Sequence, residues 1–238
     1  MIFHKNMLIE IGNSRITKTE LCFFKNKRKE GGVIINKNLY LLIYEEEVHI
    51  KKFDLPKSKG ELLYNLVKNE LSFSVGNINN ILFDYKVTTK KMDLCVEVIV
   101  FYINSQKIAF IKENDCYKNI EKVMLIQFAM KKYYEKSIRE NNYSMAFIYD
   151  KALYILAINE NNLVANSIIE NFIIEENGLI TALEIFKNKY LEQFINIKNT
   201  YLSNIDIDLN NIKENNSKAM IVNVLDRYKK EKLVSSFL

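Results

Sequence analysis

The sequence predicts an α/β protein in which mixed sheets are flanked by helices and arranged as two lobes. Short β-branched and aromatic runs dominate the first fifty residues, which is typical of strands and not of a helical bundle. A three-strand meander from Ser144 to Ile169 repeats the pattern that begins at Met7. The 238 residues are 48% apolar and 26% charged, which suits a soluble globular chain with sizeable cores.

The domain division follows from this repeat. Residues 1–143 form the first predicted lobe, with a helix–strand subdomain at about 53–103, and residues 144–238 form a second, shortened lobe. Within the subdomain, Ser58 and Glu61 have the spacing of a capping box before an apolar helical stripe. The repeat therefore indicates two related α/β halves and little linker.

Several elements are predicted from apolar spacing alone. Helical periodicity favours helices at Ile120–Ile138, behind Gly178 and at Ala219–Tyr228. A strand is expected at Val33–Ile35, and the residues Val87–Lys91 are expected to form a turn before a long central strand.

Composition argues against several function classes. The net charge of +5 comes from 34 basic and 29 acidic residues that are interspersed, so no basic nucleic-acid face is expected. Cys22, Cys95 and Cys116 are odd in number and lack CxxC spacing, which suggests reduced thiols in a cytoplasmic protein. His4 and His49 lack neighbours at ligand spacing, so no metal site is expected. Without an 18-residue apolar run, any membrane role is expected to act through a partner.

The first hairpin is the main chemical feature. An apolar strand runs into the turn Gly12-Asn13-Ser14, where backbone N–H groups and a hydroxyl can form an anion site. Glu10, two residues before the glycine, can hold a hydrated Mg²⁺. The simpler alternative is a β-hairpin with a Gly-Asn turn that needs no ligand.

Three stretches carry a family resemblance. Ile9–Lys18 resembles a "DIGSSxxK" phosphate hairpin, and Leu55–Val87 resembles an "LP…L…I…E…(I/L)xDYxV" helix–strand unit. Ser144–Asp150 lies where a second phosphate hairpin begins. In these features the chain resembles the type IV pilus assembly protein PilM and, more loosely, the cytoplasmic domain of the type II secretion protein GspL. Both belong to the actin-like ATPase superfamily.

The resemblance implies an actin-like (ribonuclease H-like) fold and a nucleotide site at the first hairpin. The candidate nucleotide-binding residues that it implies are Glu10, Gly12, Asn13, Ser14 and Lys18. It also implies a surface for a partner peptide on the helix–strand unit, since a peptide can join a groove or a sheet edge there. The candidate partner-binding residues are Leu55, Pro56, Leu63, Val67, Glu70, Phe83, Asp84 and Tyr85.

Departures from the family pattern argue against catalysis. Glu10 stands where the family has aspartate, Lys18 is one position late, and the second turn at Ile148–Ala152 contains no glycine. A side chain at that turn would keep phosphate away from the backbone. No Gly-Gly pair follows Gly32, so the adenosine-pocket motif is missing as well. We therefore expect no catalytic residue, no metal and no required cofactor, with ATP and Mg²⁺ as the one cofactor pair left open.

The expected function is that of a non-catalytic cytoplasmic scaffold at the inner face of the membrane, in a pilus or secretion machine. By resemblance, its partners are a PilN-like inner-membrane protein and the assembly ATPase, with a homodimer left open. The alternatives are an actin-like ATP-binding protein or ATPase using Glu10, Gly12 and Ser14, or a binding module unrelated to secretion.

Overall fold

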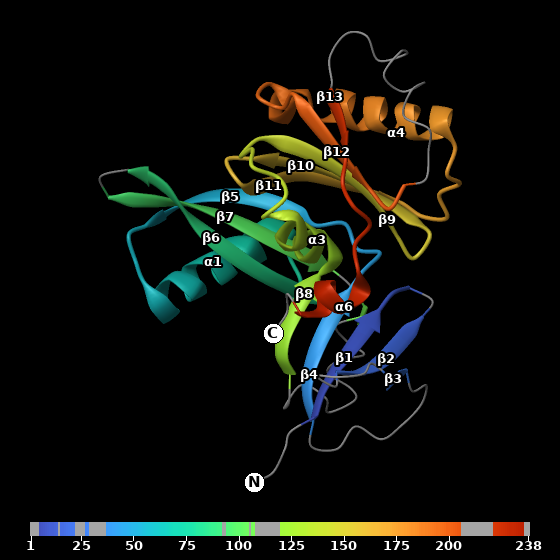
Figure 1. Cartoon of the computed structure of the whole chain (residues 1–238). Coiled ribbons are helices and arrows are strands. Elements are labelled where there is room, and N and C mark those ends of the chain that lie inside the picture. Colours follow the sequence, from blue (N-terminus) through green and yellow to red (C-terminus); the bar gives the residue numbers. More distant parts are fainter. Residues whose placement is uncertain are drawn as a thin grey trace. The chain divides into compact units, whose positions relative to one another are not determined.

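The computed structural model describes residues 5–13, 15–21, 27–28, 37–91, 94–104, 106–107, 120–205 and 221–235. The chain forms two compact units (Figure 1). One unit combines Met1–Glu45 with Asn119–Leu238, and the other consists of Glu46–Lys118. Each unit has its own sheet or sheets and its own core. Of the sequence predictions, the Val33–Ile35 strand, Ser14, His4, Cys22 and Cys116 lie outside the described residues.

The first unit contains two five-stranded sheets. The first has the order β3-β2-β1-β4-β8, formed by Lys27–Arg28, Ile16–Leu21, Lys5–Ile11, Lys37–Ile43 and Ile120–Leu125 respectively. β1 pairs antiparallel with β2 and parallel with β4, and β4 pairs parallel with β8. β1 and β4 occupy the middle of the sheet, and the side chains of Met7–Ile11 and Leu41–Ile43 are buried there.

The second sheet repeats this topology strand for strand. Its order is β11-β10-β9-β12-β13, formed by Asn162–Ile169, Ala152–Asn159, Tyr143–Tyr149, Asn199–Ser203 and Ile221–Val224 respectively. β9 pairs antiparallel with β10 and parallel with β12, which pairs parallel with β13. Nearly every residue of β9 and β10 is buried, as expected for central strands covered on both faces. The second sheet therefore has the same strand order and pairing directions as the first.

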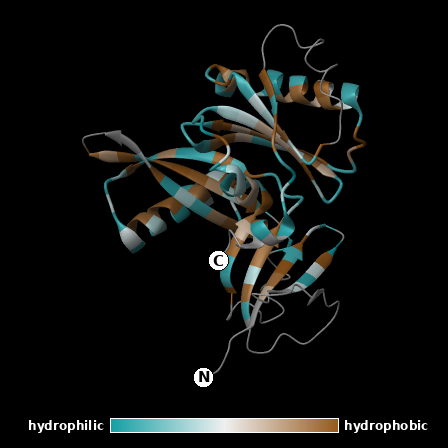
Figure 2. Cartoon of the chain, viewed as in Figure 1, coloured by the Kyte–Doolittle hydropathy of each residue, from teal (hydrophilic) through white to brown (hydrophobic). Residues whose placement is uncertain are grey.

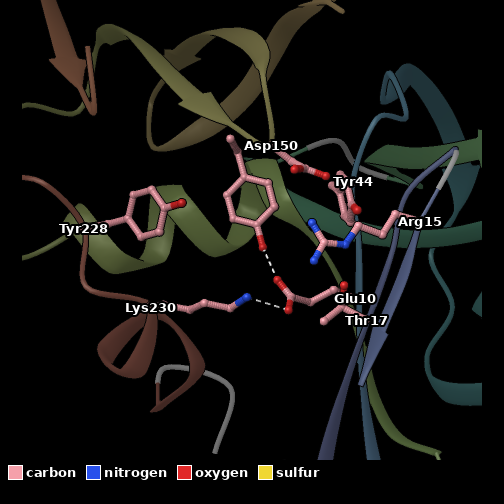
Figure 3. A pocket seen from close by; sticks show the side chains of 8 residues that line it. Glu10, Arg15, Thr17, Tyr44, Asp150, Tyr228 and Lys230 are labelled. Atoms are coloured by element: carbon pink, nitrogen blue, oxygen red, sulfur yellow. Dashed lines mark hydrogen bonds and ion pairs between the residues drawn. The ribbon is translucent and has the colours of Figure 1, made fainter. Parts of the chain in front are cut away.

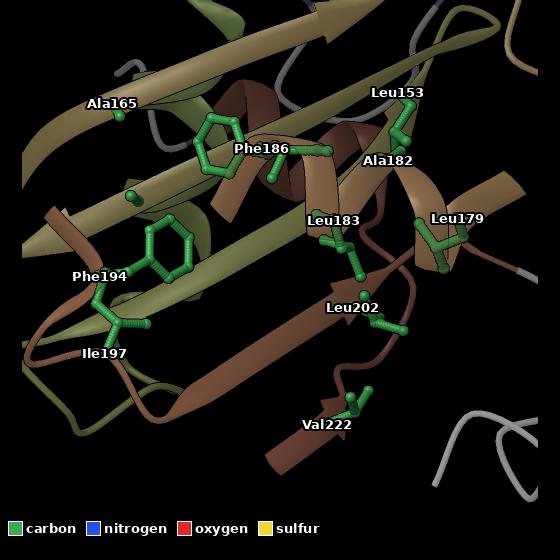
Figure 4. Packing of buried hydrophobic residues seen from close by; sticks show 13 residues of the cluster. Leu153, Ala165, Leu179, Ala182, Leu183, Phe186, Phe194, Ile197, Leu202 and Val222 are labelled. Atoms are coloured by element: carbon green, nitrogen blue, oxygen red, sulfur yellow. The ribbon is translucent and has the colours of Figure 1, made fainter. Parts of the chain in front are cut away.

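Helix α4 (Glu176–Lys189) covers one face of the second sheet. Its residues Leu179, Ala182, Leu183 and Phe186 recur at helical spacing and are buried, so one apolar stripe faces the strands. Figure 4 shows this stripe packed on Leu153, Ala165 and Leu202, with Phe194 of the 3-10 helix η2 (Leu191–Phe194) beside it. Figure 2 shows hydrophobic and hydrophilic residues alternating along the helix.

The second unit is a three-stranded sheet with one helix. The sheet has the order β5-β7-β6, formed by His49–Pro56, Cys95–Asn104 and Ile81–Lys91, and all its pairs are antiparallel. Helix α1 (Gly60–Val75) buries Leu63, Val67 and Leu71 against these strands. The long central strand that the sequence predicts is therefore confirmed as β7.

Two of the predicted helices are wrong in part, because some of their residues form strands that pair in parallel with β4 or β12. The expected helix Ile120–Ile138 begins with strand β8, and only α3 (Ile126–Tyr134) is helical. Apolar spacing alone did not distinguish the two structures, because β8 gains its backbone partners from β4, about eighty residues earlier.

The expected helix Ala219–Tyr228 contains strand β13 instead. Ile221 and Val224 are 63% and 55% exposed, while Val222 between them is buried. These residues pair in parallel with β12 and form a strand, and the helix that follows them in the described part of the chain is the short α6 (Lys230–Ser235).

Two local predictions in the second unit are also wrong. Helix α1 has Lys59 at its N-cap with no side-chain cap, so Ser58 and Glu61 do not form a capping box there. Val87–Lys91 continues strand β6 through an irregularity and does not form a turn.

Candidate functional site

A polar pocket lies in the first unit, where the first hairpins of its two sheets come together. Its volume is about 220 Å³. Figure 3 shows side chains from both sheets and from the C-terminal segment converging on it. The lining residues are Glu10, Arg15, Thr17, Tyr44, Tyr149, Asp150, Tyr228 and Lys230.

Glu10 is the buried charge of this pocket. It lies near the end of β1 and is only 4% exposed. The Tyr149 hydroxyl donates a hydrogen bond to Oε1, and Lys230 Nζ lies 2.6 Å from Oε2 (Figure 3). Each carboxylate oxygen therefore has a donor from a distant part of the chain, as a buried carboxylate requires.

Two backbone donors of the turn between β1 and β2, at Gly12 and Asn13, are already hydrogen-bonded within the chain. The Gly12 N–H donates to the Arg15 carbonyl at 2.9 Å, and the Asn13 N–H donates to Glu45 Oε2 at 2.5 Å. The Asn13 side chain donates to Glu170 Oε1 at 2.8 Å. A carboxylate of the protein thus occupies the position in which the turn would bind an external anion.

Glu45 is fixed in place to do this. Its φ of 58° lies in the left-handed region, which a residue with a Cβ rarely adopts. Its own N–H donates to the Tyr154 hydroxyl at 2.9 Å, while its carboxylate accepts from Asn13. Strand β10 and the first turn therefore hold Glu45 from two sides.

Gly12 is needed for space and not for a special φ angle. A Cβ at this position would lie 2.6 Å from the Tyr44 hydroxyl oxygen and closer still to the ring carbons. The Tyr44 ring thus packs directly on the bare backbone of the turn. It also makes an edge contact with the Tyr149 ring, with centroids 5.4 Å apart.

The second turn has a different construction. Asp150 and Lys151 connect β9 to β10 with φ angles of 46° and 67°, so two residues with side chains form a tight left-handed turn. Asp150 lines the pocket and hydrogen-bonds to the Tyr44 hydroxyl. Residues with side chains therefore form this turn, as the sequence predicts, whereas a phosphate-binding turn would need a bare backbone.

Burial keeps the phenols of the pocket neutral. Burial first, and then the Glu10 carboxylate, raises the pKa of Tyr149 far above its ordinary value. The same two causes raise the pKa of Tyr228 to about 12. Burial and the hydrogen bond to Asp150 raise the pKa of Tyr44. At neutral pH these three groups act as hydrogen-bond donors or acceptors and not as bases.

The charges of the pocket balance internally. Its lining contains two carboxylates, Glu10 and Asp150, and two cations, Arg15 and Lys230. Its volume lies below the range of about 300–1,000 Å³ that is usual for small-molecule sites. Among the described residues, no group of three or more His, Cys, Asp or Glu side chains is placed to hold a metal ion. This arrangement is suited to joining the two sheets.

The predicted nucleotide residues separate in the structure. Of the four that are described, only Glu10 lines the pocket. Gly12 and Asn13 form the turn beside it, and Lys18 is not among the lining residues although its neighbour Thr17 is. Because adjacent residues on β2 point to opposite faces, Lys18 points away from the face that carries Thr17.

Sequence reasoning missed most of the pocket. Thr17 could have been found, since it lies on the face of β2 opposite Lys18, and so could Arg15, which directly precedes that strand. Tyr44 follows a buried strand and could have been found in the same way. Lys230 gives no local signal, because it pairs with a residue 220 positions earlier.

The predicted partner residues all lie in the second unit. Leu55, Leu63 and Val67 are buried in its core, where a partner could not contact them directly. Pro56, Glu70 and Asp84 are exposed, and Phe83 and Tyr85 are half-buried. Phe83 stacks on the exposed ring of Tyr64, with centroids 5.3 Å apart.

No family model and no curated protein matches the chain. Solved structures do match it. A chain of the PilM–PilN type IV pilus biogenesis complex aligns with a TM-score of 0.61 at 11% identity, over 96% of this chain and 93% of that one. A Bacteroides thetaiotaomicron protein described as having an actin-like ATPase fold and unknown function aligns with a TM-score of 0.50 at 14% identity, over 94% of each chain.

The chain has an actin-like fold. A third match is the cytoplasmic domain of EpsL, an inner-membrane component of the type II secretion system of Vibrio cholerae. It has a TM-score of 0.50 at 7% identity, over 98% of this chain and 94% of that one. The predicted fold class and the structural likeness to PilM and GspL are therefore confirmed. The described part of the actin-like chain contains no helix long and apolar enough to cross a membrane.

Proposed function

We propose that the chain is a non-catalytic scaffold of a type IV pilus or type II secretion-like machine. It would work in the cytoplasm at the inner face of the membrane, bind a short cytoplasmic segment of a PilN-like inner-membrane protein and link that protein to the assembly ATPase. The fold shared with a chain of a PilM–PilN complex and with the EpsL cytoplasmic domain supports this role.

The observation that carries the non-catalytic part is the occupied first turn. Phosphoryl transfer needs donors that cradle the phosphates, together with a metal and a positioned nucleophile. Here the N–H groups of Gly12 and Asn13 donate to the Arg15 carbonyl and the Glu45 carboxylate. A phosphate would have to displace a carboxylate that is already fixed in position.

The second turn adds to this argument. Its Asp150 carboxylate lines the pocket and would repel a polyphosphate, which carries several negative charges. Lys230 already neutralises Glu10, the acid that would be needed for a hydrated Mg²⁺. A bound nucleotide would therefore lack a Mg²⁺ ion held by Glu10, and its phosphates would face the negative charge of Asp150.

For the partner segment, the second unit offers a sheet with two outer strands, β5 and β6. An added peptide strand can pair with such an edge. Phe83 of β6 stacks on the exposed Tyr64 ring, and the exposed Asp84 follows it on the same edge strand, so a peptide pairing with this edge would meet an aromatic surface on one face and a carboxylate on the other.

The test is direct binding of a synthetic peptide with the N-terminal cytoplasmic sequence of the membrane partner. We expect a Kd below about 100 µM, equivalent to roughly −5 kcal/mol. The F83A/D84A variant should weaken binding at least about tenfold, because it removes the side chains expected to contact the peptide. E184A, which changes an exposed residue of α4 in the other unit, is the matched control. Absence of binding by the unmodified chain would overturn the scaffold proposal.

The alternative of ATP binding is tested separately by thermal melting with Mg-ATP. A ligand present at a hundredfold excess over its Kd stabilises the native state by about 2.7 kcal/mol. We expect no shift in Tm. A clear shift would show that the Glu10-Gly12-Ser14 hairpin still binds nucleotide, whatever the outcome of the peptide experiment.

A further inference from the structure

The segment after β13 returns from the second sheet to the first. We name residues 225–233 the C-terminal strap. The Leu225 N–H donates to the Leu202 carbonyl at 2.8 Å, which continues the pairing with β12. Four residues later the Lys229 N–H donates to the Tyr133 hydroxyl at 3.0 Å, and Lys230 reaches Glu10 on β1. The strap therefore contacts both sheets of the first unit.

Helix α3 anchors the middle of the strap. The Tyr134 hydroxyl donates to the Asp226 carbonyl at 2.6 Å and lies 2.5 Å from the Ser203 hydroxyl at the end of β12. Tyr134 is 2% exposed, so this anchor is shielded from water. Leu233, at the far end, is buried as well.

The two members of the ion pair differ in access to solvent. The Glu10 side chain is 5% exposed, whereas the Lys230 side chain is 34% exposed. A buried carboxylate without its cation is strongly disfavoured. Because Lys230 approaches from the solvent side, it can leave without disturbing the strands that carry Glu10.

We propose that the C-terminal strap is a latch on the pocket. Lys230 locks it by neutralising Glu10, and the Tyr228 side chain, which lines the same pocket, moves with it when it opens. Opening exposes Glu10 and Tyr149 to solvent while both sheets remain folded. This inference depends on contacts within the chain and holds whichever partner the scaffold binds.

The test is hydrogen–deuterium exchange on the full chain, followed in peptides that cover the strap. Its amides at Leu225 and Lys229 donate to Leu202 and Tyr133, which lie outside the strap, so they report on strap opening. K230M should raise their exchange rate at least about tenfold, because Glu10 loses its counter-charge. Peptides from β10 should keep their protection.

K229M is the matched control, since the Lys229 side chain is exposed and its backbone hydrogen bonds remain. K230R keeps the positive charge and should restore most of the protection. In the E10Q background, K230M should have little further effect, because the charge that it serves is gone. Equal exchange in K230M and K229M would overturn the latch, as would a rise in K230M that extends equally to β10.

Discussion

The hairpins that open the two five-stranded sheets share one topology but differ in their turns. The first turn contains Gly12, which the Tyr44 ring requires because it leaves no room for a Cβ. The second turn contains Asp150 and Lys151, whose left-handed φ angles make a tight turn without glycine. With the same strand order, the residue at the first turn is restricted by the space that Tyr44 leaves, and the residues at the second turn are restricted by their left-handed backbone conformation.

The two sheets also contribute different chemistry to the region between them. The first sheet and the residues after it supply carboxylates, Glu10 and Glu45, and the second sheet supplies phenols, Tyr149 and Tyr154. The Tyr149 hydroxyl donates to the Glu10 carboxylate, and the backbone N–H of Glu45 donates to the Tyr154 hydroxyl. These two hydrogen bonds therefore join the two sheets.

The largest expected effect concerns the phenols at high pH. Burial raises the pKa of Tyr149 and of Tyr154 in the folded chain. Below about pH 10 both phenols are neutral in the folded and unfolded states, so their contribution to stability is fully present. Above that pH the unfolded chain loses these protons first. The free energy of unfolding should then fall by about 1.4 kcal/mol per pH unit for each phenol, until the pH passes the raised folded pKa.

The measurement is urea unfolding at several pH values from about 8 to 11. The Y149F/Y154F variant should lower the slope above about pH 10 by close to 3 kcal/mol per pH unit. Y64F, at an exposed position of the second unit, is the control. An unchanged slope in the double variant would show that these phenols do not join the sheets in neutral form.

The next effect tests the space-limited turn. G12A should destabilise the first unit by about 1–3 kcal/mol, because the new Cβ forces the packed Tyr44 ring to move. In a Y44A background the same substitution should cost little, so a double-mutant cycle measures the collision. If G12A costs the same in both backgrounds, the glycine has some other role in the turn.

A smaller contrast separates the two phenols. Y149F removes a donor to a buried carboxylate and should cost about 1.5–3 kcal/mol. Y154F removes the hydroxyl that accepts a hydrogen bond from the Glu45 N–H. Because this bond joins two uncharged groups and Glu45 is half-buried, the loss should cost about 1 kcal/mol. Thermal melts of the two single variants give the order, and a reversed order would contradict the central role of Glu10.

Much of the fold could be predicted from the sequence, because the alternation around Met7–Lys18 and Ser144–Ile169 specifies strands locally. β8 and β13 could not be predicted, because parallel partners supplied by distant strands decide them. Of the pocket, Glu10 could be found from its place before a glycine turn. Lys230 in the pocket and Glu45 beside the first turn could not, since their roles depend on contacts made only when the chain has folded.

The smallest effect is expected at the second turn, where K151G should change the stability by less than about 1 kcal/mol. Glycine relieves the left-handed φ of 67° at this exposed position, but it also increases the entropy of the unfolded chain, and the two effects nearly cancel. The Asp150 side chain and the Lys151 carbonyl, which accepts from Phe172, remain in place. Calorimetry of K151G beside G12A therefore measures the asymmetry directly: adding a glycine to one turn should matter much less than removing it from the other. Similar losses in the two variants would mean that both turns are limited by the same kind of packing.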